Sequence, residues 1–254
     1  MAFTVTATSS GSSVNRGVYL LVRVLTNAAE AGGATSGSTS GSGATASGSL
    51  TPNFSSSWVV FSISADGSGS VMPTAAANNT YDYNNNDAPD VWSTAQGHYT
   101  GTVTASTPLT YGAGSALGDH SNWCAYEVPA SGGSITVDGS SPAGVNTATL
   151  LTIATASFTP PAGAVLAAQV CAGGTGSGSG ITVTMTDTSG LGLVWTQRAI
   201  SSASDNFQPT YIFTATVPGG GGNPGPPLTD APVPVNRPVI VTGRAGWRNA
   251  GHSR

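Results

Sequence analysis

Residues 150–218 read LLTIATASFTPPAGAVLAAQVCAGG, TGSGSG, ITVTMTDTSG, LGLVWTQRAI, SSASDNFQ and PTYIFTATVP. The apolar segments of this stretch are short, rich in Val, Ile, Thr or aromatic residues, and closed by Gly, Pro, Ser or Asp. This is the pattern of strands separated by turns. None of the segments carries an apolar stripe at helical spacing, so the stretch predicts a compact antiparallel β-sandwich.

The composition of the whole chain agrees with ordered β-structure. The chain has 254 residues, of which 7% are charged, 39% are hydrophobic and 35 are glycine. A disordered chain is also polar and glycine-rich, but it usually carries more charge and fewer β-branched and aromatic residues. We therefore expect strands joined by flexible or tightly turned connections.

The first half of the sequence repeats the second half in outline. Residues 58–67, WVVFSISADG, match residues 164–173, AVLAAQVCAG, and Val128-Pro129 matches Val217-Pro218. Earlier in each half, FTV at residues 3–5 matches ITV at residues 135–137. The repeats predict two tandem Ig-like sandwich modules, residues 1–134 with long loop insertions and residues 135–219 without them.

After Pro218 the chain changes to a Gly/Pro-rich sequence, and residues 220–254 are expected to form an extended arm. The strand-like run Val239-Ile240-Val241 and a basic terminus suit an arm that adds a strand to a neighbouring sheet. A frayed tail is the alternative. The docking residues expected in the arm are Arg237, Val239, Ile240, Val241, Arg244, Trp247, Arg248 and Arg254.

The net charge of −4 argues against a nucleic-acid partner, since phosphate binding needs clustered cations. No membrane span is expected either, because the strongest apolar run, residues 17–25, contains Arg23 and is too short to cross a bilayer. Cys124 and Cys171 are too few for a disulfide framework and are expected to be buried free thiols, with a single bridge as the alternative.

The insertion at residues 67–107 is the expected recognition element, since long loops on a rigid β scaffold often carry binding residues. Aromatic rings mixed with Asn and Asp suit a sugar-binding surface, and the candidate glycan residues are Tyr81, Tyr83, Trp92 and Tyr99. The alternative is that these rings fold under the loop as a small satellite core.

The same insertion holds a weak calcium candidate, made by the oxygen donors of Asp82, Asn84, Asn86, Asp87 and Asp90. The run lacks the central Gly and the bidentate Glu of an EF-hand, so turn formation is the alternative and no other cofactor is expected. No catalytic residue is expected. A glycan hydrolase would need two facing carboxylates, with Asp82, Asp87, Asp90, Asp119 and Glu127 as the residues to inspect.

The segment ITVTMTDTSGLGLVWTQR (181–198) follows SFTPPAGAVLAAQV (157–170) and precedes TYIFTATVPGG (210–220). Together with the ending GWRNAGHSR, it resembles modules of structural proteins of tailed bacteriophages that infect actinobacteria, especially minor tail proteins. The resemblance covers mainly residues 135–254. It implies a virion component with β-sandwich modules and gives no catalytic residues to carry over.

We therefore expect a non-enzymatic virion structural protein, an exposed minor tail or capsid decoration component. It would be assembled in the host cytoplasm, displayed on the particle exterior and packed as a homo-oligomer with other virion proteins through the arm. Its loops would face the host surface, where a cell-wall glycan is a possible partner. The absence of a recognisable leader fits this expectation. The alternative is a carbohydrate-binding adhesin or secreted binding module.

Overall fold

The computed structural model describes residues 1–10, 15–40, 45–66, 72–87, 92–116, 120–147, 150–174, 181–201 and 208–219. Met1–Gly221 form one compact unit. Gly222–Arg254 lie outside the described residues, as do all the docking residues expected in the arm. The described part consists of antiparallel strands without a helix, so the all-β prediction is confirmed. It accordingly contains no helix that could span a membrane.

The strands fall into two groups according to the sandwich that they build. The first group, called here the host sandwich, comprises β1 (Val5–Ser10), β2 (Asn15–Thr26), β10 (Thr136–Val137), β11 (Val145–Thr147), β12 (Thr152–Ala154), β13 (Val165–Gly174), β14 (Thr182–Asp187), β15 (Thr196–Ile200) and β16 (Thr210–Thr216). The second, the inserted sandwich, comprises β3 (Thr35–Ser40), β4 (Thr45–Leu50), β5 (Trp58–Asp66), β6 (Asn79–Asp87), β7 (Trp92–Tyr99), β8 (Leu109–Ala116) and β9 (Ser121–Val128).

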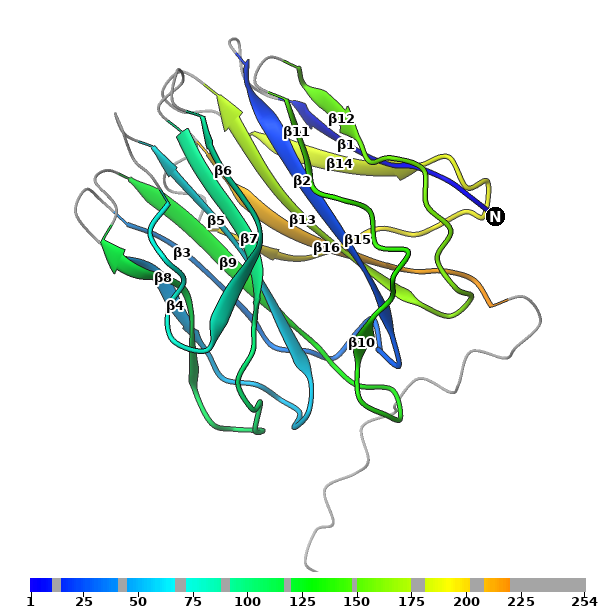
Figure 1. Ribbon diagram of the computed structural model, residues 1–254, viewed down its shortest axis with the longest axis horizontal. Coiled ribbons are helices and arrows are strands. Elements are labelled where there is room, and N and C mark those ends of the chain that lie inside the picture. The colour runs from blue at the N-terminus through cyan, green and yellow to red at the C-terminus, as the bar shows by residue number, and fades with distance from the viewer. Residues whose placement is uncertain are drawn as a thin grey trace, which may run out of the picture. The chain divides into compact units, whose positions relative to one another are not determined.

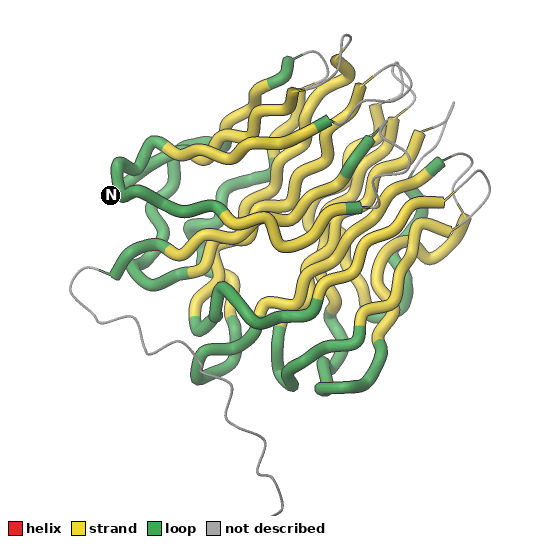
Figure 2. Tube along the Cα trace, turned by 180° about the vertical axis from the view of Figure 1, so that it is seen from behind, coloured by secondary structure: helices red, strands yellow, loops and turns green. Residues whose placement is uncertain are grey.

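Each sandwich has an inner and an outer sheet. In the host sandwich the outer sheet has the order β12-β1-β14, and the inner sheet has the order β10-β2-β13-β16-β15, with β11 also paired to β2. In the inserted sandwich the inner sheet has the order β3-β9-β5-β7-β6 and the outer sheet is the pair β4-β8. The two inner sheets pack against each other, so the described chain is a stack of four β layers (Figures 1 and 2).

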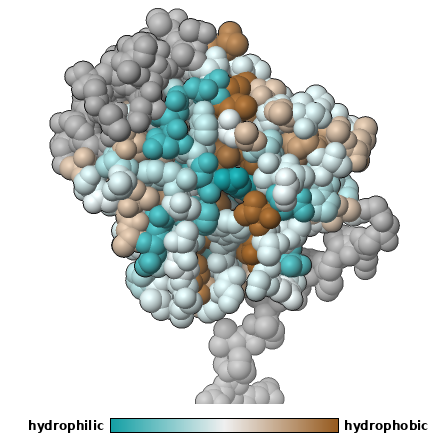
Figure 3. All heavy atoms as spheres, viewed as in Figure 1, coloured by the Kyte–Doolittle hydropathy of each residue, from teal (hydrophilic) through white to brown (hydrophobic). Residues whose placement is uncertain are grey.

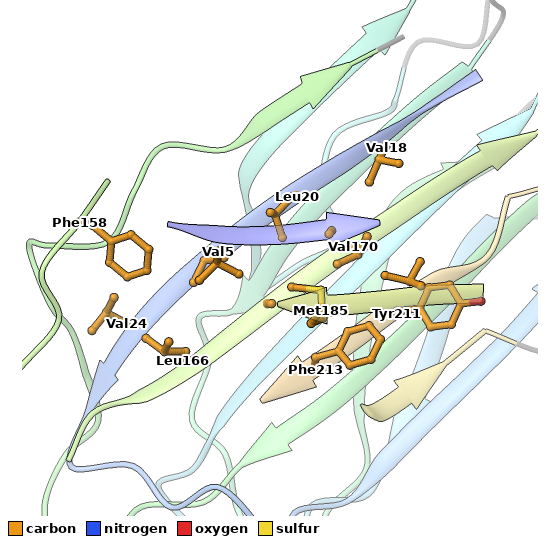
Figure 4. Packing of buried hydrophobic residues seen from close by; sticks show 14 of the residues in the cluster. Val5, Val18, Leu20, Val24, Phe158, Leu166, Val170, Met185, Tyr211 and Phe213 are labelled. Atoms are coloured by element: carbon orange, nitrogen blue, oxygen red, sulfur yellow. The ribbon is translucent and has the colours of Figure 1, made fainter. Parts of the chain in front are cut away.

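The layers of the described chain are held together mainly by three large apolar clusters. The largest fills the host sandwich, where Val5, Leu20, Leu166 and Phe213 point toward one another from four strands (Figure 4). A second cluster around Phe61 fills the inserted sandwich, and a third lies between the two inner sheets. Because β13 is covered on both faces, its residues 165–172 are all buried, which explains why they read as a nearly continuous apolar run.

The expected boundary between residues 134 and 135 does not separate the two sandwiches. Strand β1 pairs with β12 and β14, and β2 pairs with β13, so the first two strands of the chain complete the sandwich built mainly from residues 135–219. The inserted sandwich is nested between β2 and β10. The tandem arrangement at residues 1–134 and 135–219 is therefore wrong, because strand pairing is non-local and a weak repeat does not say which sheet a strand joins.

Part of the predicted repeat does have a structural counterpart. Strand β5 pairs antiparallel with β9 in the inner inserted sheet, and β13 pairs antiparallel with β16 in the inner host sheet. Strands β5 and β13 correspond to the matched segments 58–67 and 164–173. Strands β9 and β16 lead into the two matched Val-Pro pairs. The match between residues 3–5 and 135–137 has no such counterpart, since β1 lies in the outer host sheet and β10 in the inner host sheet.

The two connections between the sandwiches run side by side. Ala28 and Ala130 form an isolated antiparallel bridge, the Ala29 amide donates to the Pro129 carbonyl at 2.7 Å, and the Ser131 amide donates to the Asn27 carbonyl at 2.9 Å. Asn27 adopts a positive φ of 55°, a conformation that Asn tolerates better than most residues. The chain thus leaves and rejoins the host sandwich through one hydrogen-bonded pair of segments.

The surface of the described part is mostly weakly polar. In Figure 3 the apolar groups are scattered among pale and teal residues. Most of the exposed large hydrophobic residues, such as Leu150, Leu191 and Val194, lie in connections, whereas Val137 and Ile200 lie at the ends of β10 and β15. This surface follows from the low content of charged residues and the many Ser and Thr residues on outward strand positions.

Candidate functional site

A cluster of three ionisable side chains lies where the two inner sheets meet, an interface called here the seam. Asp82 on β6 accepts from Arg23 Nη2 on β2 through Oδ1 at 2.9 Å, and its Oδ2 lies 2.8 Å from His98 Nδ1 on β7. The three side chains are 13–21% exposed. One carboxylate therefore binds the Arg23 guanidinium of the host sandwich and a ring nitrogen of His98 in the inserted sandwich at a partly buried position.

A β-bulge places Asp82 in this cluster. Tyr81 pairs with Gly97 and Tyr83 pairs with Gln96, so Asp82 is an extra residue in β6. A bulge bends the strand and changes the direction of the side chains that follow it. As a result Tyr81 and Tyr83, which would share a face in a regular strand, lie on opposite faces of the inner inserted sheet.

The ring of Tyr83 lies at the seam beside this cluster. It packs against Tyr19 and Cys171 of the inner host sheet. A Cβ atom placed on Gly144 would lie 2.5 Å from the Tyr83 ring, so the absence of a side chain at Gly144 permits this close approach. On the other side of the cluster, the Trp58 ring meets the His98 ring edge-on, with the ring centroids 4.8 Å apart.

Polar groups continue along the seam. Gln169 Nε2 on β13 donates to the carbonyl oxygens of Phe61 and Gly97 at 2.5 and 3.0 Å, across the boundary between the two sandwiches. The Cys171 thiol donates to the Ile63 carbonyl at 3.4 Å. These side chains are buried, and they fix the register of one sandwich against the other because an unsatisfied buried polar group would be costly.

The two cysteines are buried free thiols, as expected from the sequence. Both lie at the seam, and Thr210 on β16 joins them: it is the cross-strand neighbour of Cys171, and its hydroxyl donates to Cys124 Sγ at 3.3 Å. Burial raises the pKa of Cys124 to about 12 and also raises the pKa of Cys171. Both thiols therefore stay protonated near neutral pH, which makes them poor nucleophiles.

A second ion pair crosses the seam near the connection into the inserted sandwich. Glu30 Oε1 accepts from Arg198 Nη2 on β15 at 2.9 Å, and Glu30 Oε2 accepts from the Thr216 hydroxyl on β16 at 2.7 Å. The Glu30 carbonyl also accepts from the Tyr126 hydroxyl at 2.7 Å. Glu30 thus ties the connection to strands of both inner sheets.

The candidate glycan residues do not form one surface. Tyr81 packs into the core of the inserted sandwich, where its ring is 6.2 Å from that of Phe61, and burial raises its pKa. Tyr99 packs against the same core, whereas Tyr83 lies at the seam. Tyr81 and Tyr99 thus pack against the main core of the inserted sandwich and not in a separate satellite core under the loop. The side chain of Trp92 lies outside the described residues, although its backbone begins β7.

The calcium candidates are divided in a similar way. Asp82 uses its two oxygens on Arg23 and His98, and Asn84 is exposed. The side chains of Asn86 and Asp87, and the whole of Asp90, lie outside the described residues. In the described part of the chain no three His, Cys, Asp or Glu residues come together in a way that could hold a metal ion.

The Arg23–Asp82–His98 cluster has the donors and acceptors of a proton relay, but the described residues that contact it include no nucleophile. Among the described residues, the partners of His98 are the Asp82 carboxylate and the Trp58 ring, and neither is a nucleophile. Of the carboxylates that a hydrolase would need, Asp82 and Glu127 belong to separate networks, since Glu127 is bound by Ser57 and by backbone amides. The arrangement is suited to joining sheets.

Arg23, Glu30 and Arg198 were not among the residues expected to matter. Arg23 had a usable signal, because a charged residue inside the apolar run 17–25 must find a partner when that run is buried. No sequence signal marks Glu30 or Arg198, whose pairing joins residues 168 positions apart. Comparison with protein-family models, with curated proteins and with solved structures finds no match to this chain.

Replacing Asp82 with asparagine should lower the free energy of unfolding by about 1–2 kcal/mol, because the amide cannot balance the partly buried charge of Arg23. Urea unfolding of the single variants Asp82→Asn and Arg23→Gln and of the double variant measures the coupling. The double variant should lose clearly less stability than the sum of the two single losses. Additive losses would contradict a direct interaction across the seam.

Proposed function

We propose that this chain is a non-enzymatic structural protein of a virion, an exposed minor tail or capsid decoration component. The observation that carries the proposal is the use of the ionisable side chains at the seam. Asp82 binds both Arg23 and His98, Glu30 binds Arg198, and both networks join the two sandwiches. Because these ionisable side chains bind one another across the seam, they support the proposal of a rigid scaffold.

The four-layer stack adds to this support. Two sandwiches share a buried interface with both apolar and hydrogen-bonded contacts, so they move as one body more readily than two domains joined by a linker. A surface with few charges and many hydroxyl groups suits close packing in an assembly. The resemblance of residues 135–254 to phage structural modules points to a virion as that assembly.

In this proposal the arm beyond residue 219 docks on neighbouring subunits, and the loops of the inserted sandwich face outward. The arm residues 237–254 contain four of the seven arginines of the chain, whereas the chain as a whole carries a net charge of −4. A basic arm and an otherwise acidic chain are complementary in charge, which supports contact between copies or with acidic neighbours.

The test uses particles of the phage that encodes the chain. Mass spectrometry of purified particles is expected to detect the chain at a constant copy number, and deletion of residues 223–254 is expected to abolish its incorporation. Circular dichroism of the truncated protein should show retained β-structure, since Met1–Gly221 form a compact unit. Purified particles without the chain would contradict the virion role, and unchanged incorporation of the truncated protein would contradict docking through the arm.

A further inference from the structure

Strand β14 has one unpaired edge. On one side it pairs with β1 over six consecutive residue pairs, from Val5↔Asp187 to Ser10↔Thr182. On the other side no strand among the described residues pairs with it, so β14 ends the outer host sheet (Figure 1). An open edge of this kind offers a row of backbone donors and acceptors to another chain.

The register identifies the backbone groups that face this open edge. The Thr188 amide donates to the Thr4 carbonyl at 3.1 Å, in the same register as the β1–β14 pairs. Hydrogen-bonded pairs alternate along an antiparallel ladder, so Thr182, Thr184 and Thr186 bond to β1. The amide and carbonyl groups of Val183 and Met185 therefore point toward the open edge.

The edge lacks the features that usually prevent pairing. Residues 182–186 contain no charge, proline or glycine, and the register with β1 has no bulge. The opposite edge of the same sheet, β12, has only three residues. At the edges of the inner sheets, β6 and β15 both carry register shifts, and β15 includes Arg198. Natural edge strands are commonly protected by short length, charge or bulges, whereas β14 has six residues, no bulge and a single charged residue, Asp187, at its end.

The side chains of β14 are self-complementary. The sequence Thr182-Val183-Thr184-Met185-Thr186 alternates exposed Thr with buried apolar residues, and Met185 points into the host core (Figure 4). An antiparallel copy centred on Thr184 would place Thr opposite Thr and Val183 opposite Met185. The charged Asp187 would lie opposite Ile181 and away from its own copy. In this register, the backbone amide and carbonyl groups of Val183 would form hydrogen bonds with those of Met185 in the second copy. These are the groups that face the open edge.

We infer that β14 is a self-association edge, and that its partner is β14 of a second copy of this chain in antiparallel register about Thr184. The contact is isologous, because the same strand serves on both sides of a two-fold axis. It joins two outer host sheets into one continuous sheet, β12-β1-β14-β14-β1-β12. Thr–Thr pairs across the junction add to the backbone hydrogen bonds.

The pairing deepens the proposed function by naming a contact between copies, and its biological meaning rests on that function. The junction is only about five residues long, well below the roughly 800 Å² per partner of a typical stable interface. It should therefore be weak in solution. In an assembly, where other contacts hold the copies near one another, the same junction gains from a high effective concentration.

A charge-exchange experiment on the purified full-length protein tests the pairing. In sedimentation equilibrium the unaltered protein is expected to dimerise with rising concentration. Thr184→Lys and Thr184→Glu should each remain monomeric, because two like charges would face each other, and an equimolar mixture should dimerise again. Thr184 is exposed, so neither variant should disturb folding. The matched control is Thr152→Lys, an exposed residue on the opposite edge of the same sheet, which should dimerise like the unaltered protein.

A cross-linking experiment checks the register. Thr184 would face its own copy as a non-hydrogen-bonded pair, the closer of the two pair types, so Thr184→Cys should give an intermolecular disulfide under air oxygen, which accepts the two electrons and two protons. Cys124 and Cys171 are fully buried and should not interfere. Thr152→Cys is the control. A monomer at every concentration, or equal cross-linking of the two variants, would overturn the pairing without affecting whether particles contain the chain.

Discussion

Replacing Glu127 with alanine should lower the free energy of unfolding by about 3–5 kcal/mol, because four hydrogen-bond donors lose their acceptor, at a cost of about 1–3 kcal/mol for each donor that stays unsatisfied. Glu127 on β9 is fully buried. Its Oε2 accepts from the amides of Ala34 and Asn53 at 2.9 and 2.7 Å, and its Oε1 accepts from the Phe54 amide and the Ser57 hydroxyl at 2.9 and 2.6 Å. The variant leaves all four donors without this acceptor. Chemical denaturation followed by tryptophan fluorescence measures the loss.

Ser57→Ala is the matched control for this prediction, because it removes one of the four donors and leaves the carboxylate bound by three amides. Its expected cost is about 1 kcal/mol. If Glu127→Ala lost no more stability than Ser57→Ala, the carboxylate would not be the centre on which the connection near Ala34 and the loop at residues 53–57 depend.

Replacing Gly37 with alanine should lower the free energy of unfolding by about 3 kcal/mol, at the upper end of the usual cost of overpacking. A Cβ atom on Gly37 in β3 would lie 2.0 Å from the Ile200 carbonyl oxygen and 3.0 Å from its carbon, in β15 of the other sandwich. Both atoms belong to the backbone, so no side-chain rotation relieves the clash. The two inner sheets would have to move apart at this point.

Gly139→Ala provides the control for Gly37→Ala. A Cβ atom on Gly139 would meet nothing within 4 Å, so this variant should change stability by less than about 0.5 kcal/mol. Thermal unfolding of both variants, with the unaltered protein alongside, measures the difference. Equal stability of the two variants would mean that the contact between β3 and β15 is not tight, which contradicts the packing of the seam.

The strands themselves were largely predictable from the sequence. The alternation in residues 181–187, with Thr outward and Val183 and Met185 inward, is a local signal of a half-buried strand, and the structure has β14 there. The run in residues 165–172 also reads as a strand. Its nearly unbroken apolar character reflects burial on both faces, because the inner sheet of the other sandwich packs against β13, a contact that the tandem interpretation did not predict.

The candidate site was less predictable than the strands. The insertion at residues 67–107 was expected to carry binding residues, and it does supply Asp82 and His98 to the seam cluster. The partner from β2, Arg23, lies 59 positions before Asp82 in the chain, and no local pattern connects the two. The bulge at Asp82 was also invisible in the sequence, although it determines that Tyr81 and Tyr83 face opposite sides.

The sequence by itself determined the all-β class and the positions of many strands, and it favoured free thiols over a single bridge. These properties depend on local alternation, turn residues and composition, which act within a few positions of the chain. Only the tertiary structure decided that β1 and β2 join the later strands, that one sandwich is nested within the other, and that charged residues meet at the seam. Strand partners are chosen by burying faces against each other over long sequence separations, and that choice depends on the folded chain as a whole.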